Sequence, residues 1–174
     1  RKADPRAGLG PAGAQLPLLA FLRAARESRR YAALIDGDDS FDPGTTEDAL
    51  LEHLLWVRCR KTDEALAAMD ILLRDENFAL VLLDLRRQEA RRLNRIPATR
   101  WYRFQRVAEN SGTAGVVFTN RPTVASARAR IRVTADFGLD AIEIPRDRLA
   151  DSLGMETLRA RVFSAETTPA ARAG

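Results

Sequence analysis

The sequence has only one cysteine and one histidine among its 174 residues. A single cysteine, Cys59, excludes a disulfide within the chain, and we expect it to be a buried thiol in a strand, beside Trp56 and Val57, and in a reducing compartment. A single histidine, His53, argues against a zinc site and against a histidine-dependent catalytic triad. The sequence therefore predicts no metal centre.

Long hydrophobic runs and low-complexity segments are missing as well. No apolar stretch approaches the ~20 residues of a membrane-spanning helix, and no apolar leader is visible near the start. Gly (10) and Pro (8) are not enriched, and hydrophobic residues make up 45% of the chain. We therefore expect one folded, cytoplasmic domain over residues 1–166, with no membrane contact and with flexible ends at 1–7 and 167–174.

Apolar strands and helical segments alternate along the chain. Apolar runs predict strands at residues 31–35, 54–57, 78–83 and 115–119, and weaker patterns predict two more near 131–133 and 158–162. Helical spacing predicts helices at residues 15–28, 62–73 and 98–110, with Thr62 as the cap of the second and a short helix after Thr46. Strands that are apolar throughout and separated by helices favour an α/β fold, with a mostly parallel sheet flanked by helices on both faces.

Residues 8–15 have the glycines of a phosphate-binding loop but not its two functional side chains. In the motif G-x-x-x-x-G-K-[ST], Gly8 and Gly13 hold the glycine positions, Ala14 stands at the lysine and Gln15 at the hydroxyl. The missing side chains would hold the β- and γ-phosphates and Mg²⁺. The glycines could still present N–H groups to an anion, although a plain connection that turns the chain fits them better. The loop predicts loss of ATP hydrolysis and no bound cofactor.

Two acidic groups end apolar strands. Asp36, Asp38, Asp39 and Asp42 follow the first strand, and together they could bind a cation or form a solvated loop, which we favour. Asp84 ends the most apolar strand of the chain. We expect Asp84 to have a structural role, because the helix start upstream lacks the groups that would hold Mg²⁺ with it.

Positive charge is concentrated in residues 85–106, which hold eight arginines against one glutamate, a net charge of +7 in a chain of +4. These arginines are Arg86, Arg87, Arg91, Arg92, Arg95, Arg100, Arg103 and Arg106. Arginine suits phosphate and carboxylate contacts, and Trp101 and Tyr102 could stack on bases. Nucleic acid, an acidic protein surface and plain solvation remain open explanations. A second basic group comprises Arg121, Arg128, Arg130 and Arg132.

The order of these features resembles the RecA family over residues 8–135. In that family a phosphate loop and a helix lead to a strand end of the form F-I-D-A-E-H-A-L-D-P, and residues 34–43 here read L-I-D-G-D-D-S-F-D-P. The strand at 54–57 precedes D-E-A-L, which is similar to the family's E-x-A-L helix. Residues 79–84 resemble the Walker B strand, and residues 116–121 resemble the next strand, with its terminal asparagine.

The resemblance implies a RecA-like fold and roles for single positions. Asp38 falls where RecA-like ATPases carry the glutamate that polarises the attacking water, and Asp84 matches the Walker B aspartate. The arginines after residue 84 lie where RecA has a DNA-facing loop, and Arg121 begins the region of its other DNA loop. The lost phosphate-loop residues make the chain look more like the divergent ImuA and SulA relatives than like RecA itself.

These observations predict a non-catalytic RecA-fold accessory protein in the DNA damage response or SOS mutagenesis. As an ImuA-like protein it would bind RecA, a Y-family polymerase or DNA. One alternative is a SulA-like inhibitor of cell division that binds FtsZ. Another is a residual DNA-stimulated ATPase. The expected interaction residues are Arg86, Arg87, Arg91, Arg92, Arg95, Arg100, Arg103 and Arg121.

Overall fold

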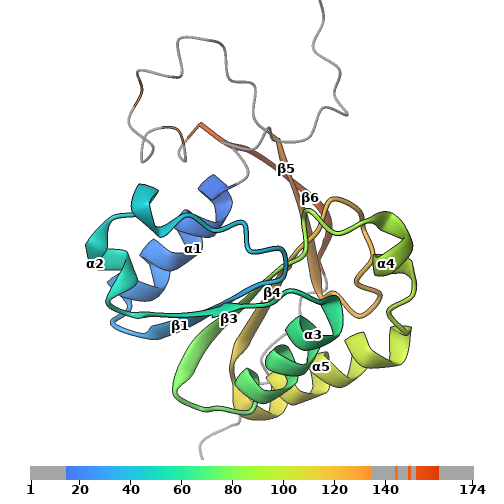
Figure 1. Ribbon diagram of the computed structural model, residues 1–174. Helices are drawn as coiled ribbons and strands as arrows, with labels where there is room; N and C mark the ends of the chain where they lie inside the picture. The colour runs from blue at the N-terminus through green and yellow to red at the C-terminus, as the bar shows by residue number, and fades with distance from the viewer. Residues whose placement is uncertain (1–14, 135–143, 145–148, 150–151, 161–174) are drawn as a thin grey trace, which may run out of the picture.

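The computed structural model describes residues 15–134, 144, 149 and 152–160 (Figure 1). The glycine loop, with Gly8, Gly13 and Ala14, lies outside the described residues, and so do the two chain ends that the sequence predicts to be flexible. Among the helices of the described part, none has both the length and the apolar character needed to cross a bilayer.

Strands and helices alternate as the sequence predicts. The elements are α1 (Leu16–Glu27), β1 (Tyr31–Asp36), the 3-10 turn η2 (Pro43–Thr45), α2 (Asp48–Leu51), β2 (Leu54–Arg58), α3 (Thr62–Leu72), β3 (Phe78–Asp84), α4 (Ala90–Asn94), α5 (Ala98–Ser111), β4 (Ala114–Phe118), β5 (Ala129–Thr134) and β6 (Gly154–Ala160). The sequence did not predict α4, because its five residues are too few to show helical periodicity. Gly112 ends α5 with a φ of 70°, a backbone conformation that glycine adopts without strain.

Four strands form one parallel sheet in the order β2-β1-β3-β4. The chain runs from β1 outward to β2 and then crosses back to β3 on the other side of β1. The strand order therefore reverses between β1 and β3. In open α/β sheets, ligands bind outside the carboxyl ends of the strands at such a reversal.

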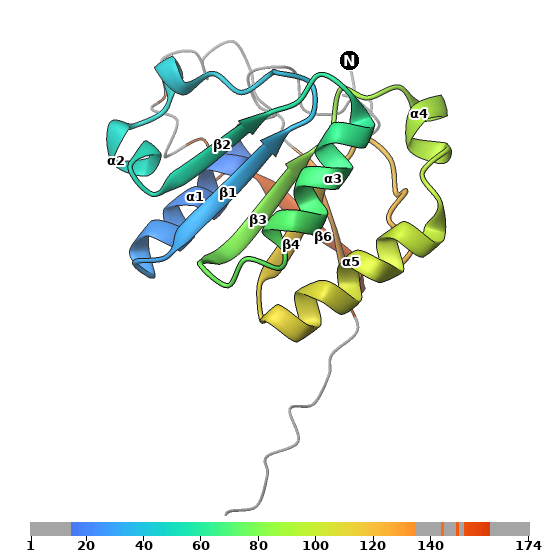
Figure 2. The same cartoon turned by 60° about the horizontal axis from the view of Figure 1, so that its bottom comes forward.

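Helices cover both faces of this sheet, which confirms the predicted α/β architecture (Figure 2). Ala33 and Ile35 of β1 pack on the face that α3 and α5 cover. Ala32 and Leu34 point to the opposite face and pack against α1. Both faces of β1 are thus buried, and this explains why its sequence is apolar throughout.

The last two strands stand apart from the parallel sheet. β5 and β6 pair only with each other among the described residues, as an antiparallel ribbon. The ribbon begins with Ala129 rather than near residue 131, and its second strand covers Gly154–Ala160, while the last two predicted strand residues, 161–162, lie outside the described residues. The parallel sheet therefore consists of β1 to β4, and the ribbon forms a second, separate sheet.

The loop from β2 to α3 departs from the sequence prediction at two positions. Thr62 is the first residue of α3 and not its cap; Lys61 is the N-cap, and its backbone N–H donates to Glu64. Cys59 follows β2 rather than lying within it, and it is 4% exposed, which confirms the buried thiol. Burial, followed by the negative charges of Glu64 and Asp36, raises the pKa of the Cys59 thiol.

Candidate functional site at the carboxyl ends of the strands

Asp36 organises the loop that follows β1. Its side chain is fully buried, and its oxygens accept the N–H groups of Ser40 at 2.9 Å and of Phe41 at 2.8 Å. The expectation of a solvated acidic loop is therefore wrong for this residue. A buried carboxylate needs hydrogen-bond donors, and the loop provides them by folding its backbone around Asp36.

Gly37 lets this loop approach β3. Its N–H donates to the backbone oxygen of Asp84 at 3.0 Å. A Cβ at position 37 would lie 2.7 Å from that oxygen and 2.8 Å from Cδ2 of Leu85. Only glycine fits without a shift of the backbone, and this close approach brings the ends of β1 and β3 together.

Asp84 forms a buried ion pair with Arg86, two residues further along the chain. Nε of Arg86 donates to Oδ1 at 2.9 Å and Nη2 donates to Oδ2 at 2.5 Å, while the backbone N–H of Arg86 also donates to Oδ1. The side chains are 5% and 18% exposed. The guanidinium also lies over the ring of Phe118, 5.4 Å from its centre. Both carboxylate oxygens of Asp84 therefore face a permanent internal cation.

Asp38 is held by Gln88, a residue that the sequence did not single out. Nε2 of Gln88 donates to Oδ1 of Asp38 at 2.6 Å and to the backbone oxygen of Gly37 at 3.2 Å. Oε1 of Gln88 accepts the hydroxyl of Thr62 at 2.9 Å. The amide thus ties the ends of β1 and β3 to the start of α3. An isolated glutamine carries no sequence signal, so this contact could be found only in the structure.

Burial raises the pKa of Asp38, and the nearby charges of Asp84 and Asp36 raise it further. A carboxyl group whose pKa is raised by folding destabilises the folded state once it ionises, so stability falls as the pH rises above the ordinary pKa. We expect Asp38→Asn to raise the melting temperature at pH 7 and to change it little near pH 3. Thermal melts from pH 3 to pH 8 measure this difference. Glu76→Gln, at an exposed position, is the control, and an equal gain there would contradict the assignment.

Gln15 connects the start of α1 with the same loop. It is the N-cap of α1, and its Nε2 donates to the backbone oxygen of Ser40 at 3.2 Å. The residue at the hydroxyl position of the phosphate-loop motif is therefore in contact with protein backbone. Gln15 therefore links the start of α1 to the loop after β1.

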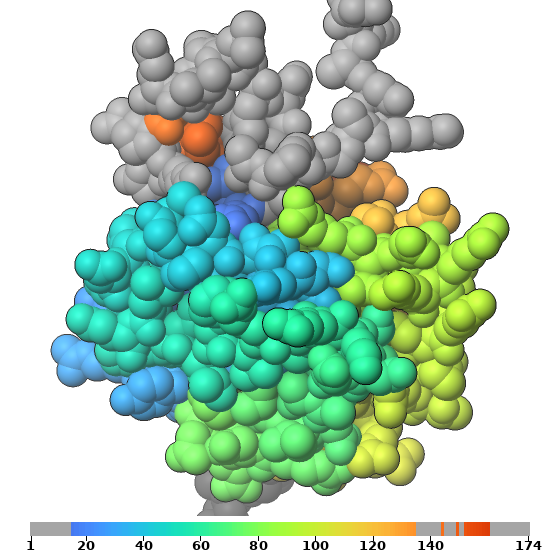
Figure 3. All heavy atoms as spheres, in the orientation of Figure 1, coloured from blue at the N-terminus to red at the C-terminus, as the bar shows by residue number. Residues whose placement is uncertain are grey.

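A cavity of about 260 Å³ opens at this edge of the sheet. Segments after β1, β2 and β3 contribute the lining residues, which are Gly37, Asp38, Asp39, Cys59, Arg60, Gln88 and Arg92. These segments lie side by side on the molecular surface (Figure 3). Asp39 is already engaged by Arg58, whose Nε and Nη2 donate to its two oxygens at 2.5 and 2.6 Å.

The structure divides the arginines of residues 85–106 that the sequence predicts to be interaction residues into three groups, while the charge of the eighth, Arg106, acts on Glu109. Arg86 is paired with Asp84, as described above. Arg100 lies 3.7 Å from Asp63, and Arg103 binds both oxygens of Asp70, so these two arginines connect α5 to α3. The remaining predicted interaction residues are exposed and have no acidic partner within the described segments; they are Arg87, Arg91, Arg92 and Arg95.

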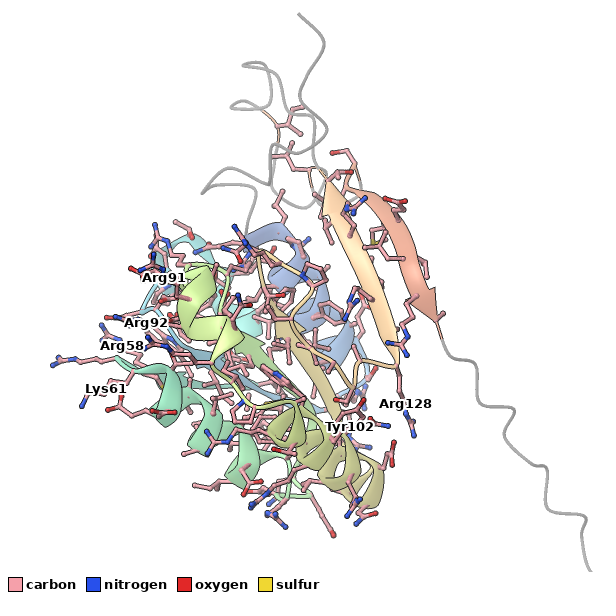
Figure 4. All side chains as sticks on the ribbon, turned by 90° about the vertical axis from the view of Figure 1, so that its right-hand side faces the viewer. Arg58, Lys61, Arg91, Arg92, Tyr102 and Arg128 are labelled. Carbon is pink, nitrogen blue, oxygen red and sulfur yellow. The ribbon has the colours of Figure 1, made fainter. Side chains whose placement is uncertain are left out.

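Trp101 cannot supply a stacking surface, which corrects the sequence prediction. It is 2% exposed and packs edge-on against Phe104 in the core between α5 and the sheet. Tyr102 is 56% exposed, but it lies well apart from Arg91 and Arg92 (Figure 4). The aromatic and the unpaired basic residues therefore do not form one surface.

The second basic group is largely engaged by other parts of the chain. Arg128 pairs with Glu109, and Arg132 pairs with Glu156 across the β5–β6 ribbon. Arg130 donates to the backbone oxygen of Val124 at 2.9 Å. Arg121 is exposed in the segment after β4.

Two basic residues that follow β2 add to the positive charge of the exposed arginines of α4. Arg60 and Lys61 are exposed and form no ion pair in the described parts of the chain, although the charge of Arg60 acts on the carboxylate of Asp39. Arg60 lines the same cavity as Arg92, and Lys61 lies on the same side of the molecule as Arg91 and Arg92 (Figure 4). We call Arg60, Lys61, Arg91 and Arg92 the basic rim. The sequence signal, three basic residues within positions 58–61, was present but lay outside the arginine-rich region.

The comparisons with known proteins address the fold. No protein-family model matches the chain, and no curated protein sequence matches it. Among solved structures, the crystal structure of the RadB recombinase is similar, with a TM-score of 0.54 and 14% sequence identity over 70% of this chain and 70% of that chain. A likeness at this identity shows the fold alone. The chain therefore has a RecA-like α/β fold, as the resemblance implies.

Proposed function

We propose that this chain is a non-catalytic RecA-fold accessory protein of the DNA damage response or SOS mutagenesis, similar in role to ImuA. It acts by binding RecA, a Y-family polymerase or DNA rather than by hydrolysing ATP. The observation that carries this proposal is the buried pair of Asp84 and Arg86 at the Walker B-like position.

The residues at this site do not fit a magnesium–nucleotide complex. Mg²⁺ binds through carboxylates and phosphate oxygens and demands near-octahedral geometry. Here both oxygens of Asp84 accept hydrogen bonds from Arg86. The side chain of Gln15 contacts Ser40, and Ala14 offers no charge to a phosphate. The internal guanidinium thus supplies, at Asp84, the positive charge that a metal ion would bring.

Asp38 also differs from a water-activating carboxylate. Its Oδ1 accepts a hydrogen bond from Gln88, and its Oδ2 is buried with no partner among the described residues. A general base must reach the water that it deprotonates. The arrangement therefore supports a structural role for Asp38 in the loop after β1.

The purified chain is expected to bind no ATP and to show no ATP turnover above background, with or without single-stranded DNA. Binding of a fluorescent ATP analogue and release of phosphate, each with and without Mg²⁺, measure the two properties. Arg86→Ala, which frees Asp84, is the informative comparison, and it should remain inactive because lysine and hydroxyl are still missing. A DNA-stimulated rate in the unaltered chain that disappears on Asp84→Ala would show a residual ATPase instead.

A further inference from the structure

The basic rim combines two arginines that the sequence predicts to be interaction residues, Arg91 and Arg92, with two basic residues that it did not single out, Arg60 and Lys61. Its four cations come from two separate segments, the loop between β2 and α3 and the helix α4. Arg60 and Arg92 line one cavity, and Lys61 and Arg91 lie on the same side of the molecule as Arg92 (Figure 4). We propose that the rim binds an acidic segment of a partner protein. This inference rests on the proposed function, in which the chain acts by binding.

The rim is one place where positive charge without an ion pair remains among the described residues; Arg87 and Arg95 are others. Arg86, Arg100 and Arg103 are neutralised by Asp84, Asp63 and Asp70. The rim residues have no such partner in the described part of the chain. Like charges held this close repel one another, so a counter-charge from outside the chain would stabilise the arrangement. Arginine forks bind carboxylates in a bidentate manner, as Arg103 and Arg58 already do within this protein.

Backbone geometry distinguishes a carboxylate partner from a phosphate ligand. Phosphate sites at loops and helix starts use several free backbone N–H groups. Around this cavity four of those groups are already used: Gly37 donates to Asp84, Cys59 donates to Asp36, and Arg60 and Lys61 donate to Glu64. Contacts to a ligand therefore come mainly from the side chains of the rim.

The residues of the cavity wall also favour a carboxylate partner over a phosphate ligand. Asp38 and Asp39 line it, and a regularly spaced chain of phosphates would meet their negative charge. A protein segment can place carboxylates on the rim and an uncharged side chain in the cavity between them. Single-stranded nucleic acid would also gain from aromatic surface, whereas the exposed Tyr102 lies elsewhere (Figure 4).

The test uses the full chain and a fluorescein-labelled 12-residue peptide that contains several glutamates, with the same peptide carrying glutamines and a 12-nucleotide oligothymidylate as comparisons. Fluorescence anisotropy at low salt is expected to show binding of the glutamate peptide and none of the glutamine peptide. Arg91→Glu with Arg92→Glu should weaken binding by about tenfold or more. Lys61→Glu should act in the same direction.

Arg29→Glu with Arg30→Glu is the matched control. These two adjacent, exposed arginines precede β1 and therefore lie at the opposite edge of the parallel sheet. The control should bind the glutamate peptide like the unaltered chain, and both double variants should keep their melting temperature, because exposed charges contribute little to stability. Equal loss in the control would overturn the proposal, since net charge alone would then explain binding.

Tighter binding of the oligothymidylate would also overturn it and would identify a nucleic-acid surface. In that case the logarithm of the binding constant should fall linearly with the logarithm of the salt concentration, with a slope of roughly −0.7 per phosphate contacted on a single strand. The peptide measurement is independent of nucleotide chemistry. If the glutamate peptide does not bind and the chain also shows no ATP turnover, the proposed function stands, and only the rim is rejected as its interaction surface.

Discussion

Removing either partner of the buried pair between Asp84 and Arg86 is expected to destabilise the fold by about 3–5 kcal/mol, because a charge then stays buried without its counter-charge. In Arg86→Ala the carboxylate of Asp84, 5% exposed, loses both of its side-chain donors. In Asp84→Ala the guanidinium of Arg86 keeps, within the described part of the chain, only its contact with the ring of Phe118. Urea unfolding of the two variants at pH 7 measures the loss.

The double variant separates pairing from packing. When both charges are absent, no unpaired ion remains, so Asp84→Ala with Arg86→Ala should lose much less stability than the two single losses added together. Simple additivity would mean that the two side chains act independently and that the pair is not the reason for the buried arginine.

The chain offers a matched control for this experiment in Arg103 and Asp70. This pair has the same two-pronged geometry, with distances of 2.9 and 2.7 Å, but Arg103 is 61% exposed. Exposed ion pairs contribute ~0–1 kcal/mol, so Arg103→Ala should be nearly neutral. A large loss for Arg103→Ala together with a small one for Arg86→Ala would contradict our account of the site.

Gly37→Ala is the second substitution for which we expect a large effect, about 2–4 kcal/mol of lost stability. The added methyl group would meet the backbone oxygen of Asp84 and the side chain of Leu85 at less than 3 Å. Relief of this clash requires the two strand ends to separate, and the hydrogen bond from the Gly37 N–H to Asp84 would be lost. Urea unfolding of the variant gives the magnitude.

Gly44→Ala tests whether the effect belongs to the position rather than to the type of substitution. The nearest atom to a Cβ at Gly44 is Oδ1 of Asp42 at 3.3 Å, on an exposed side chain that can move. We expect a change within about 1 kcal/mol there. If Gly37→Ala were as mild as this control, the close approach of β1 to β3 would not be required for stability.

The sequence predicted the strands of the parallel sheet well, because each of them is an apolar run and the two central ones, β1 and β3, are also buried. The runs at 31–35 and 78–83 are apolar on both faces, and only a strand covered by two layers of helices gives such a run a dry environment on each side. The short helix α4 and the cap of α3 were missed or misplaced. Their positions depend on contacts with other segments, such as that of Thr62 with Gln88.

The candidate site was predictable only in part. The sequence placed Asp36 and Asp84 at the ends of two apolar strands of a parallel sheet, and the structure shows that these strands are neighbours. It could not show that Asp36 is enclosed by its own loop or that Asp84 is paired with Arg86. Trp101 is a similar case, because helical spacing alone does not say whether an aromatic residue beside arginines faces the sheet or the solvent.

The sequence by itself determined the α/β class, the order of the strands along the chain and the absence of the lysine and hydroxyl of a phosphate loop, since these depend on composition and spacing. Only the tertiary structure decided which charges are free. Arg103 pairs with Asp70, 33 residues away in the sequence, and Arg60 and Arg92 line one cavity although they follow different strands. The electrostatic state of an arginine depends on the distance to its nearest carboxylate, and that distance is fixed only when the chain has folded.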